Sequence, residues 1–372
     1  MKLKPKLKKR MIIFIAILLG LSTSGYIFLE QKQFGQLPTG NRLERVKKSP
    51  NFRDGAFQNQ HFTPDLAEGT SYFDILKAYL NKTKLSEPKQ NIPSIKTNLL
   101  ALDSSKTQII WFGHSSYFIK TNGLNILIDP VFSGNASPVS FFAKNYDGAN
   151  EYNVDDFPEL DMVIITHDHY DHLDYKTIDK LKHKTKHFYT SLGVGAHLNS
   201  WGITDDKISE FDWWDSLKIS DDIQLIATPA RHFSGRKFKR NQTLWASYIL
   251  KTPTENIFLG GDSGFDTHFK EIGNKYGPFD MALLECGQYN KMWGYIHMMP
   301  EQVVQAAIDL NTKVLMPVHW SKFTLALHPW NEPIKQVTTI AKQNNIKTTT
   351  PLIGQPVIIN QNYPDSIWWD FE

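Results

Sequence analysis

The sequence predicts an α/β protein in which helices pack on layered sheets. From Thr107 onward, short apolar runs rich in Ile, Val, Leu and Phe alternate with polar clusters, a pattern typical of buried strands. Helical patterns lie between several of these runs, and strands that alternate with helices favour a layered α/β domain. Hydrophobic residues make up 41% of the chain and charged residues 21%, which is usual for a folded protein and argues against global disorder.

The first 30 residues have the pattern of a membrane-targeting segment. The apolar run 11–29 approaches the ~20 residues that span a bilayer. We expect residues 1–30 to form an uncleaved signal-anchor, because no clear cleavage site follows the run; a cleaved signal peptide is the alternative. Under the positive-inside rule, the basic end lies in the cytoplasm and the rest of the chain on the extracytoplasmic (periplasmic) side. The basic residues before the run are Lys2, Lys4, Lys6, Lys8, Lys9 and Arg10.

Residues 31–50 are polar and predict a linker to a domain over residues 51–372. A helix is expected near Tyr72–Leu80, before a proline-containing stretch. Another is expected over Pro300–Leu310, where four apolar residues share one face and the proline suits the first turn. Buried strands are expected at Gln108–Phe112, Leu124–Ile128, Met162–Ile165, Ile223–Ile226, Asn256–Leu259, Met281–Leu284 and Lys313–Met316.

Charge and cysteine usage exclude several classes of protein. The net charge is +3, and much of the basic excess lies in the first ten residues. Because no basic stripe remains in the body of the chain, we expect no nucleic-acid partner. The single cysteine, Cys286, excludes an internal disulfide and a CxxC metal site. Nothing in the sequence indicates an oligomeric state.

The strongest chemical signal is the segment THDHYDHLD at 166–174. His167, His169, Asp171 and His172 fall within six residues, directly after an expected strand. Imidazole and carboxylate groups are the usual ligands of catalytic zinc. Residues two apart in an extended segment point the same way, whereas adjacent residues point apart. Two adjacent ligands therefore suit two neighbouring metal ions better than one.

Three later strands each lead to a further metal-binding residue type. These residues are His232, Asp262 and His319. Groups at strand ends gather where loops converge on a rigid sheet. Together with the loop at 166–174 they supply seven donors, enough for two Zn²⁺ ions and a bridging carboxylate. A polar loop with incidental histidines is the alternative interpretation of the loop, and the density of histidines argues against it.

On these residues the chain resembles the metallo-β-lactamase superfamily, and it is similar to its N-acylphosphatidylethanolamine-hydrolysing phospholipase D branch. The resemblance runs from about residue 51 to near the C-terminus. It implies a four-layer αββα sandwich with a dimetal site on one edge. The basic N-terminal anchor departs from the branch's pattern. The segments that carry the closer resemblance are WFGHSS at 111–116, DPVFS at 129–133, HFSGR at 232–236, RNQTLW at 240–245, GDSG at 261–264 and HMMPE at 297–301.

The resemblance also implies roles for the donors. His167, His169 and His232 would hold one zinc ion. Asp171, His172 and His319 would hold the other, and Asp262 would bridge both. The implied reaction is cleavage of a phospholipid phosphodiester by a hydroxide that bridges the metal ions. Asp171 would also orient the nucleophile, and His297 is the implied polar group near the leaving alkoxide, with a helix-start histidine as its alternative.

Other residues carry weaker expectations, each with a structural alternative. Asp129 would accept a hydrogen bond from a ligand histidine, or would only end a strand. Arg231 and Arg236 flank His232 and would contact a phosphate, or would lie on the surface. The Trp213–Trp214 pair would line an acyl pocket or belong to the core. His114 would sit near the site or be a buried strand histidine, and the sequence assigns no role to His328.

Three other functions remain open from sequence. A lactonase, a β-lactam hydrolase or another hydrolase of the same fold would use a similar hydroxide, although Asp262 stands where β-lactam hydrolases tend to carry Cys. A di-iron oxidoreductase would replace His169 by a carboxylate. A membrane-anchored binding module would lack some of the donors. The preferred reading is a zinc-dependent phosphodiesterase acting on a phospholipid or another small-molecule ester.

Overall fold

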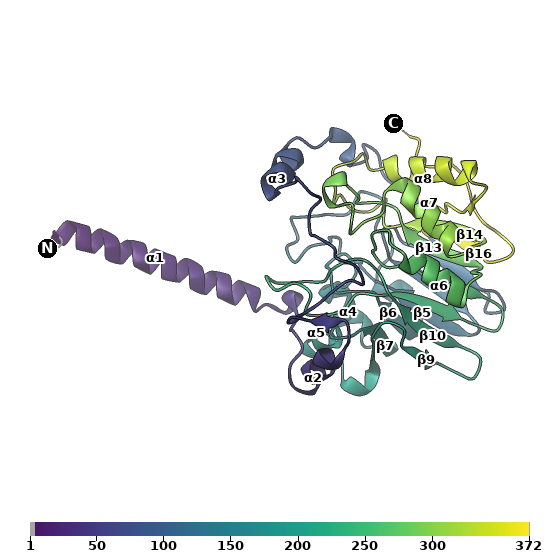
Figure 1. The fold of residues 1–372 in the computed structure, drawn as a ribbon, viewed down its shortest axis with the longest axis horizontal. Helices are drawn as coiled ribbons and strands as arrows, with labels where there is room; N and C mark the ends of the chain where they lie inside the picture. The colour runs from purple at the N-terminus through teal and green to yellow at the C-terminus, as the bar shows by residue number, and fades with distance from the viewer. Residues whose placement is uncertain (1–3, 372) are drawn as a thin grey trace.

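The computed structural model describes residues 4–371, and two seven-stranded sheets face each other in its body (Figure 1). Lys2, one of the predicted basic residues, lies outside the described residues. The first sheet has the order β16-β3-β4-β5-β6-β7-β8. Its strands are β3 (Gln108–Trp111), β4 (Tyr117–Thr121), β5 (Leu124–Ile128), β6 (Leu160–Ile165), β7 (Thr185–Ser191), β8 (Ile208–Phe211) and β16 (Pro356–Ile358).

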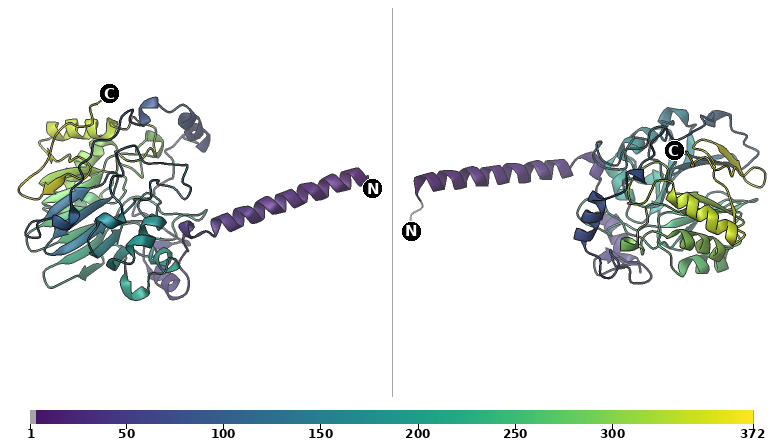
Figure 2. Two further views of the ribbon diagram at one scale, coloured as in Figure 1. Left: turned by 180° about the vertical axis from the view of Figure 1, so that it is seen from behind. Right: turned by 90° about the horizontal axis from the view of Figure 1, so that it is seen from above.

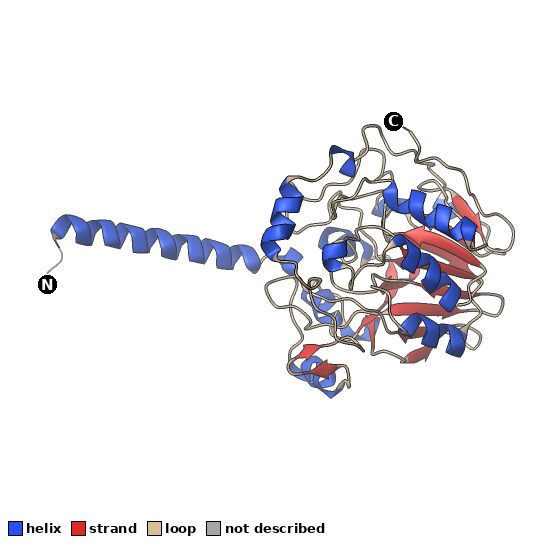
Figure 3. Ribbon diagram, turned by 45° about the horizontal axis from the view of Figure 1, so that its top comes forward, coloured by secondary structure: helices blue, strands red, loops and turns tan. Residues whose placement is uncertain are grey.

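The second sheet has the order β15-β14-β13-β12-β11-β10-β9. Helices cover the outer faces of the two sheets, and Figure 3 shows helices side by side over the second sheet. The strands are β9 (Ser216–Lys218), β10 (Gln224–Thr228), β11 (Ser247–Lys251), β12 (Asn256–Leu259), β13 (Met281–Glu285), β14 (Val314–Val318) and β15 (Lys347–Thr348). The helices are α4 (Tyr175–Leu181) and α5 (Gly195–Ser200) on the first sheet, and α6 (His268–Tyr276), α7 (Pro300–Asp309) and α8 (Glu332–Gln343) on the second.

The pleat of β6 explains the four layers. Met162 and Ile164 point into the core between the sheets, whereas Val163 and Ile165 join a separate outer cluster. Ile178 of α4 belongs to that outer cluster. Alternate side chains of one strand leave opposite faces of a sheet, so a strand with no polar face needs cover on both sides. The predicted four-layer αββα sandwich is confirmed.

The predicted elements appear with their ends shifted by at most two residues. The helix expected at Tyr72–Leu80 is α3 (Tyr72–Leu80), capped by Ser71 and Asp74. A small hairpin and five short 3-10 turns complete the body. They are β1 (Phe52–Arg53), β2 (Ala56–Phe57), η2 (Lys84–Ser86), η3 (Leu99–Ala101), η4 (Val154–Asp156), η5 (Asp205–Lys207) and η6 (Lys291–Trp293).

Residues 31–50 differ from the predicted linker, because they pack against the body. They form η1 (Lys32–Phe34) and α2 (Gly40–Lys48). Val46 is fully buried in the central core. Arg42 forms ion pairs with Glu210 at 3.0 Å and with Asp205 at 2.7 Å. The apolar and basic residues in this stretch therefore fix it to the first sheet.

The N-terminal helix α1 (Pro5–Leu29) projects away from the body in every view (Figure 2). None of its residues is buried. It has the length and composition of a membrane span, and a signal sequence near the N-terminus has the same properties. The helix is therefore compatible with the predicted signal-anchor.

Candidate metal centre

Parallel strands bring the predicted donors to one edge of the sandwich. β5, β6 and β7 run parallel in the first sheet, and β12, β13 and β14 run parallel in the second. The carboxyl ends of parallel strands meet at the same edge of a sheet. His167 follows β6, Asp262 follows β12 and His319 follows β14. Residues far apart in sequence therefore meet at this edge.

The loop after β6 is held by a buried carboxylate between two of the donors. Asp168 accepts hydrogen bonds from the Gly235 amide at 2.7 Å, from Thr243 Oγ1 at 2.8 Å and from His197 at 3.1 Å. Arg236 Nη1 donates to the carbonyl of Asp168 at 2.7 Å. These bonds turn Asp168 away from the centre and leave its neighbours free to face it.

One group of donors consists of three imidazoles. Nδ1 of His169 lies 2.9 Å from Nε2 of His167 and 3.2 Å from Nε2 of His232. Oδ2 of Asp262 lies 3.8 Å from His167 Nε2 and 3.7 Å from His232 Nε2. These four residues place their donor atoms within 4.8 Å of one another, which is a spacing that a single metal ion can join.

The second group contains Asp171, His172 and His319, together with His114. Asp171 Oδ2 lies 3.5 Å from His172 Nε2 and 2.8 Å from His114 Nε2. From the sequence alone, His114 could be either a residue of the site or a buried histidine of a strand. The structure brings it to the site, where it contacts a predicted donor.

Asp262 lies between the two groups. Its Oδ2 is 3.2 Å from His172 Nε2, and its Oδ1 is 3.0 Å from His319 Nδ1. Among residues 4–371, neither His172 Nε2 nor Asp262 Oδ1 has a hydrogen-bond partner, although both are buried. Buried polar atoms are rarely left unpaired. Imidazole and carboxylate donors with unpaired atoms at their meeting point fit a pair of divalent metal ions.

Groups outside the two donor groups orient His172 and His232 through hydrogen bonds to their second ring nitrogen. Asp129 Oδ2 accepts from His172 Nδ1 at 2.7 Å, as expected from its place at the end of β5, and Asp129 also accepts from the amide and hydroxyl of Thr166. His232 Nδ1 donates to the carbonyl of Ile296 at 2.9 Å. Ligand histidines usually donate their second ring N–H in this way, which fixes the tautomer and the ring orientation.

Charge at the centre favours a cation near His172. Burial alone would lower the pKa of His172, but Asp262, Asp171 and Asp129 raise it well above its usual value. Burial would raise the pKa of Asp262, yet His172 and His319 hold it well below the normal range. Two ionised carboxylates in a buried pocket stabilise positive charge, whether a proton or a metal ion carries it.

His297 lies beside the donors and is paired with a carboxylate that the sequence analysis missed. Glu285, the last residue of β13, accepts from His297 Nδ1 at 2.7 Å and from the Met298 amide at 2.7 Å. Burial opposes protonation of His297, but Glu285 raises its pKa to about 9. Glu285 could have been found in the same way as Asp262, because each is an acidic residue at or just after the end of a buried strand.

The backbone around the centre is strained at three non-glycine residues. His114, Asp129 and His319 have φ of 53°, 42° and 67°. Such left-handed conformations cost about 1 kcal/mol or more each and tend to cluster at functional sites. Asp129 and His319 directly follow the ends of β5 and β14, and His114 lies three residues after the end of β3, so each is in a turn that directs its side chain toward the centre.

A pocket of about 330 Å³ opens onto the centre. His169, Asp171, His232, Asp262, His297 and His319 line its floor. Its walls are mainly apolar, from Leu66, Tyr72, Ile75, Phe233, Trp293, Ile296 and Leu325. Gln288 and the ion pair of Arg240 with Asp65, at 2.6 Å, also line it.

The structure places four other candidates away from the centre. Arg236 is buried and donates to backbone carbonyls, and Arg231 is held by Thr63 and the carbonyl of Phe62, so neither is free to meet a phosphate. The Trp213–Trp214 pair belongs to the core, which was the alternative interpretation: Trp213 is buried in it and Trp214 packs against it. His328 accepts from the Gln288 amide at 2.9 Å and stacks on Tyr289, which is a structural role.

Comparison with known proteins agrees with this geometry. The model of the β-lactamase superfamily domain matches residues 124–320. An uncharacterised protein of Mycobacterium tuberculosis is 39% identical over 331 residues, covering 87% of this chain and 88% of that protein. N-acyl-phosphatidylethanolamine-hydrolyzing phospholipase D 1 of Caenorhabditis elegans is 30% identical over 228 residues, covering 58% of this chain and 64% of that protein.

Among solved structures, the metallo-hydrolase Igni18 of Ignicoccus hospitalis superposes with a TM-score of 0.55 at 20% identity, over 69% of this chain and all of that chain. At this identity the likeness concerns the fold alone. The family match covers more than half of the chain and includes both halves of the candidate centre. The chain therefore belongs to the β-lactamase superfamily, as a metal-dependent hydrolase of the metallo-β-lactamase fold.

Proposed function

We propose that this protein is a binuclear zinc phosphodiesterase that cleaves a membrane phospholipid, with N-acylphosphatidylethanolamine as the first candidate. The observation that carries the proposal is the pair of donor groups that share Asp262. A divided set of histidines around one carboxylate suits two metal ions that act on a single phosphate. The name of the Caenorhabditis elegans relative supports the substrate class.

The ligand assignment follows the two groups. His167, His169 and His232 would hold one ion, Asp171, His172 and His319 would hold the other, and both ions would share Asp262. Imidazole and carboxylate donors with a buried environment suit zinc. When bound, two such ions would polarise a phosphoryl oxygen and activate a water molecule as a nucleophile at neutral pH.

Asp171 and His114 position the nucleophile. Asp171 is only partly buried and lines the pocket, so one of its oxygens is available to accept a hydrogen bond from an attacking water. The other oxygen, Oδ2, accepts from His114 Nε2 at 2.8 Å. This bond fixes the rotation of the carboxylate, and a fixed carboxylate orients the water in line with the scissile bond.

His297 acts as the proton donor to the leaving alkoxide. Its Nδ1 donates to Glu285, which leaves Nε2 for the pocket that His297 lines. The raised pKa keeps the ring protonated at neutral pH. A positioned acid of this kind typically contributes about 10²- to 10⁴-fold to the rate.

The apolar walls of the pocket suit acyl chains, and α1 suits a lipid substrate. We infer that residues 1–30 are an uncleaved signal-anchor that holds the enzyme at the extracytoplasmic face of a membrane. Lys4, Lys6, Lys8, Lys9 and Arg10 lie at its cytoplasmic end. The enzyme then meets its substrate in the same membrane.

The test is hydrolysis of N-acylphosphatidylethanolamine in mixed micelles by the full chain, with bound metal counted in the same sample. We expect two zinc ions per chain and release of N-acylethanolamine and phosphatidic acid. Asp262→Asn should lose both metal and activity, whereas Asp155→Asn, an exposed carboxylate far from the pocket, should lose neither. Two zinc ions without release would refute the phospholipid substrate, and lactone hydrolysis by the same sample would then favour the lactonase alternative.

A further inference from the structure

Helix α3 is an apolar helix that buries none of its residues. Tyr72 and Ile75 line the pocket over the metal centre. The neighbouring face carries Phe73, Leu76 and Leu80, at a spacing of one helical face, and their exposed fractions are 72%, 53% and 76%. Contiguous exposed apolar side chains on a folded protein mark a surface that meets a partner or a membrane.

Exposed aromatic residues continue this surface toward the N-terminal helix. Phe141 is 78% exposed and lines two cavities. One of these cavities includes Tyr79 of α3, and the other includes Phe28 near the end of α1. Phe238 is 88% exposed, and its neighbour Lys237 forms an ion pair with Glu30 at 3.1 Å, directly after α1. The apolar rim is the set Phe73, Leu76, Leu80, Phe141 and Phe238.

The chain between α1 and the body is short and fixed. The carbonyl of Lys32 accepts from Trp201 Nε1 at 2.7 Å, and the carbonyl of Gln33 accepts from Arg236 Nη2 at 2.6 Å. Phe34 is buried in the body. From Leu29 to Phe34 even an extended chain reaches only about 17 Å. A bilayer spanned by α1 therefore lies close against the body.

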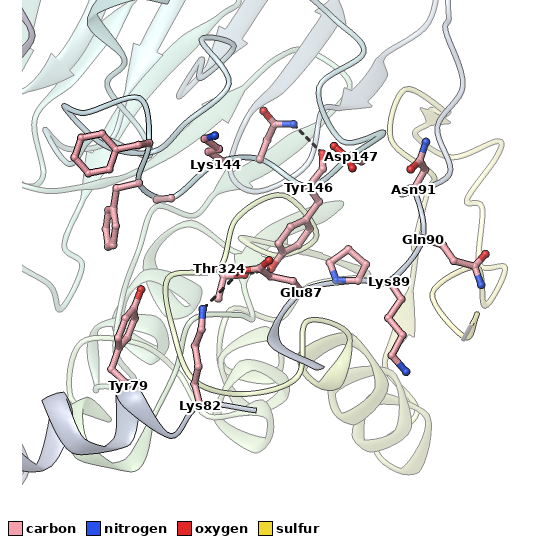
Figure 4. Close-up of a pocket in the computed structure, with 15 residues that line it drawn as sticks. Tyr79, Lys82, Glu87, Lys89, Gln90, Asn91, Lys144, Tyr146, Asp147 and Thr324 are labelled. Atoms are coloured by element: carbon pink, nitrogen blue, oxygen red, sulfur yellow. Dashed lines mark hydrogen bonds and ion pairs between the residues drawn. The ribbon is translucent and has the colours of Figure 1, made fainter. Parts of the chain in front are cut away.

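Helix α3, which carries three of the five rim residues, lies on the side where such a bilayer would be. In Figures 1, 2 and 3, α3 lies on the side of the body from which α1 projects. Three lysines lie near the apolar residues there: Lys82, Lys89 and Lys144 line the cavity of about 460 Å³ beside Phe141 (Figure 4). Two carboxylates, Glu87 and Asp147, line the same cavity, and Lys82 pairs with Glu87 at 3.6 Å, so the lysines exceed the carboxylates by one. Apolar side chains flanked by lysines are typical of segments that lie in the interfacial layer of anionic membranes.

We propose that the apolar rim inserts into the membrane that α1 spans, so that the mouth of the catalytic pocket rests on the lipid surface. The role of this docking rests on the proposed function: if the substrate is a lipid, Tyr72 and Ile75 would guide it from the leaflet into the pocket. The same helix would dock on the membrane through one face and form the pocket wall through the next.

The test uses the full chain in vesicles of phosphatidylethanolamine and phosphatidylglycerol that contain a spin-labelled lipid. Because Cys286 is fully buried, a cysteine introduced at the surface can be labelled selectively with an environment-sensitive fluorophore. Phe73→Cys and Phe141→Cys report on the rim. Leu217→Cys is the matched control, an exposed apolar position on β9. We expect quenching and a blue shift at both rim positions and neither at Leu217, and quenching at the rim no greater than at Leu217 would overturn the proposal.

A second measurement tests whether hydrolysis of lipid in a membrane depends on the apolar rim. The triple variant Phe73→Ser, Leu76→Ser and Leu80→Ser should lower hydrolysis of lipid in vesicles by about tenfold or more, because it removes the apolar area that enters the membrane. Its hydrolysis of the same lipid in detergent micelles should stay unchanged. Equal loss in both assays would contradict docking. If the wild-type chain hydrolyses no phospholipid at all, the proposed function fails, and the quenching result still decides whether the rim enters the membrane.

Discussion

Asp129 does not line the pocket, but it orients His172, one of the proposed metal ligands. Its carboxylate accepts from His172 Nδ1 and from both polar groups of Thr166. Asp129→Asn keeps the shape, and asparagine tolerates the φ of 42° at this position. We expect metal affinity, measured by competition with a chelator, to fall about 10- to 100-fold, because His172 loses its charged partner. An unchanged affinity would mean that Asp129 only shapes the strand end.

Glu285 provides a separate prediction, because it acts on His297. Glu285→Gln removes the charge that raises the pKa of His297 to about 9. A proton donor is lost as pH rises through its pKa, so the descending limb of the pH–rate profile should move to lower pH. At neutral pH kcat should fall by about 100-fold. Metal content should remain at two ions, and a lost ion would instead identify Glu285 as a ligand.

Lys322 is fully buried three residues after His319, and its ammonium group donates to the carbonyls of Phe112 and Val131. Burial lowers its pKa to about 7. Above that pH the unfolded chain binds a proton that the native state has lost, so this group makes stability rise with pH until the unfolded pKa near 10.4 is reached.

The variant Lys322→Met lacks this titration. Relative to the variant, the wild-type protein should therefore gain unfolding free energy between about pH 7 and about pH 9, by at most about 1.4 kcal/mol per pH unit. Urea unfolding at the two pH values measures the difference. Parallel pH dependences for the two proteins would show that Lys322 keeps its ordinary pKa.

The loop that carries His297 depends on a glycine in another loop. A Cβ at Gly264 would meet the carbonyl oxygen of Tyr295 at less than contact distance. Gly264→Ala should therefore push residues 295–297 away and break the bond between Ile296 and His232. Displaced backbone of this kind costs about 1–3 kcal/mol.

We expect at least about tenfold loss of kcat/KM in Gly264→Ala, since small misplacements of catalytic groups are costly. Gly294→Ala is the matched control in the same loop, because its nearest contact is 3.7 Å and its φ is ordinary. Equal activity of the two variants would show that the loop adapts. The thermal midpoint of each variant separates a local shift from a loss of fold.

The elements show which features of the site a sequence can predict. The loop at 166–174 was predictable because its donor types fall within six residues after a buried strand. His232, Asp262 and His319 followed from strand ends. His114 contacts Asp171 across 57 residues of chain, and only the strand order of the first sheet, in which β4 and β5 lie between β3 and β6, brings them together. Residues 31–50 were mistaken for a linker, because Val46 and Arg42 reveal their role only through the distant residues they contact.

At the scale of the whole molecule, helix α3 lies on the side of the body from which α1 projects, so the proposed anchor, apolar rim and pocket mouth would share one side. The rim and α1 are joined by Glu30, Phe34 and the loop at 236–240, and α3 links the rim to the pocket. A pocket that opened away from the membrane would require its lipid substrate to leave the bilayer through water. The shared side removes that cost, because apolar chains stay out of water throughout.

The proposed signal-anchor also predicts the compartment in which the body lies. Five basic residues, Lys4 to Arg10, precede the span, so the body should lie outside the cytoplasm. Leu217→Cys in the full chain provides a reporter, since Cys286 is buried. A membrane-impermeant maleimide should label Leu217→Cys in intact spheroplasts as fully as in lysed ones, whereas labelling only after lysis would place the body in the cytoplasm. In that case the rim and pocket would face the inner leaflet, and the substrate would be a lipid of that leaflet.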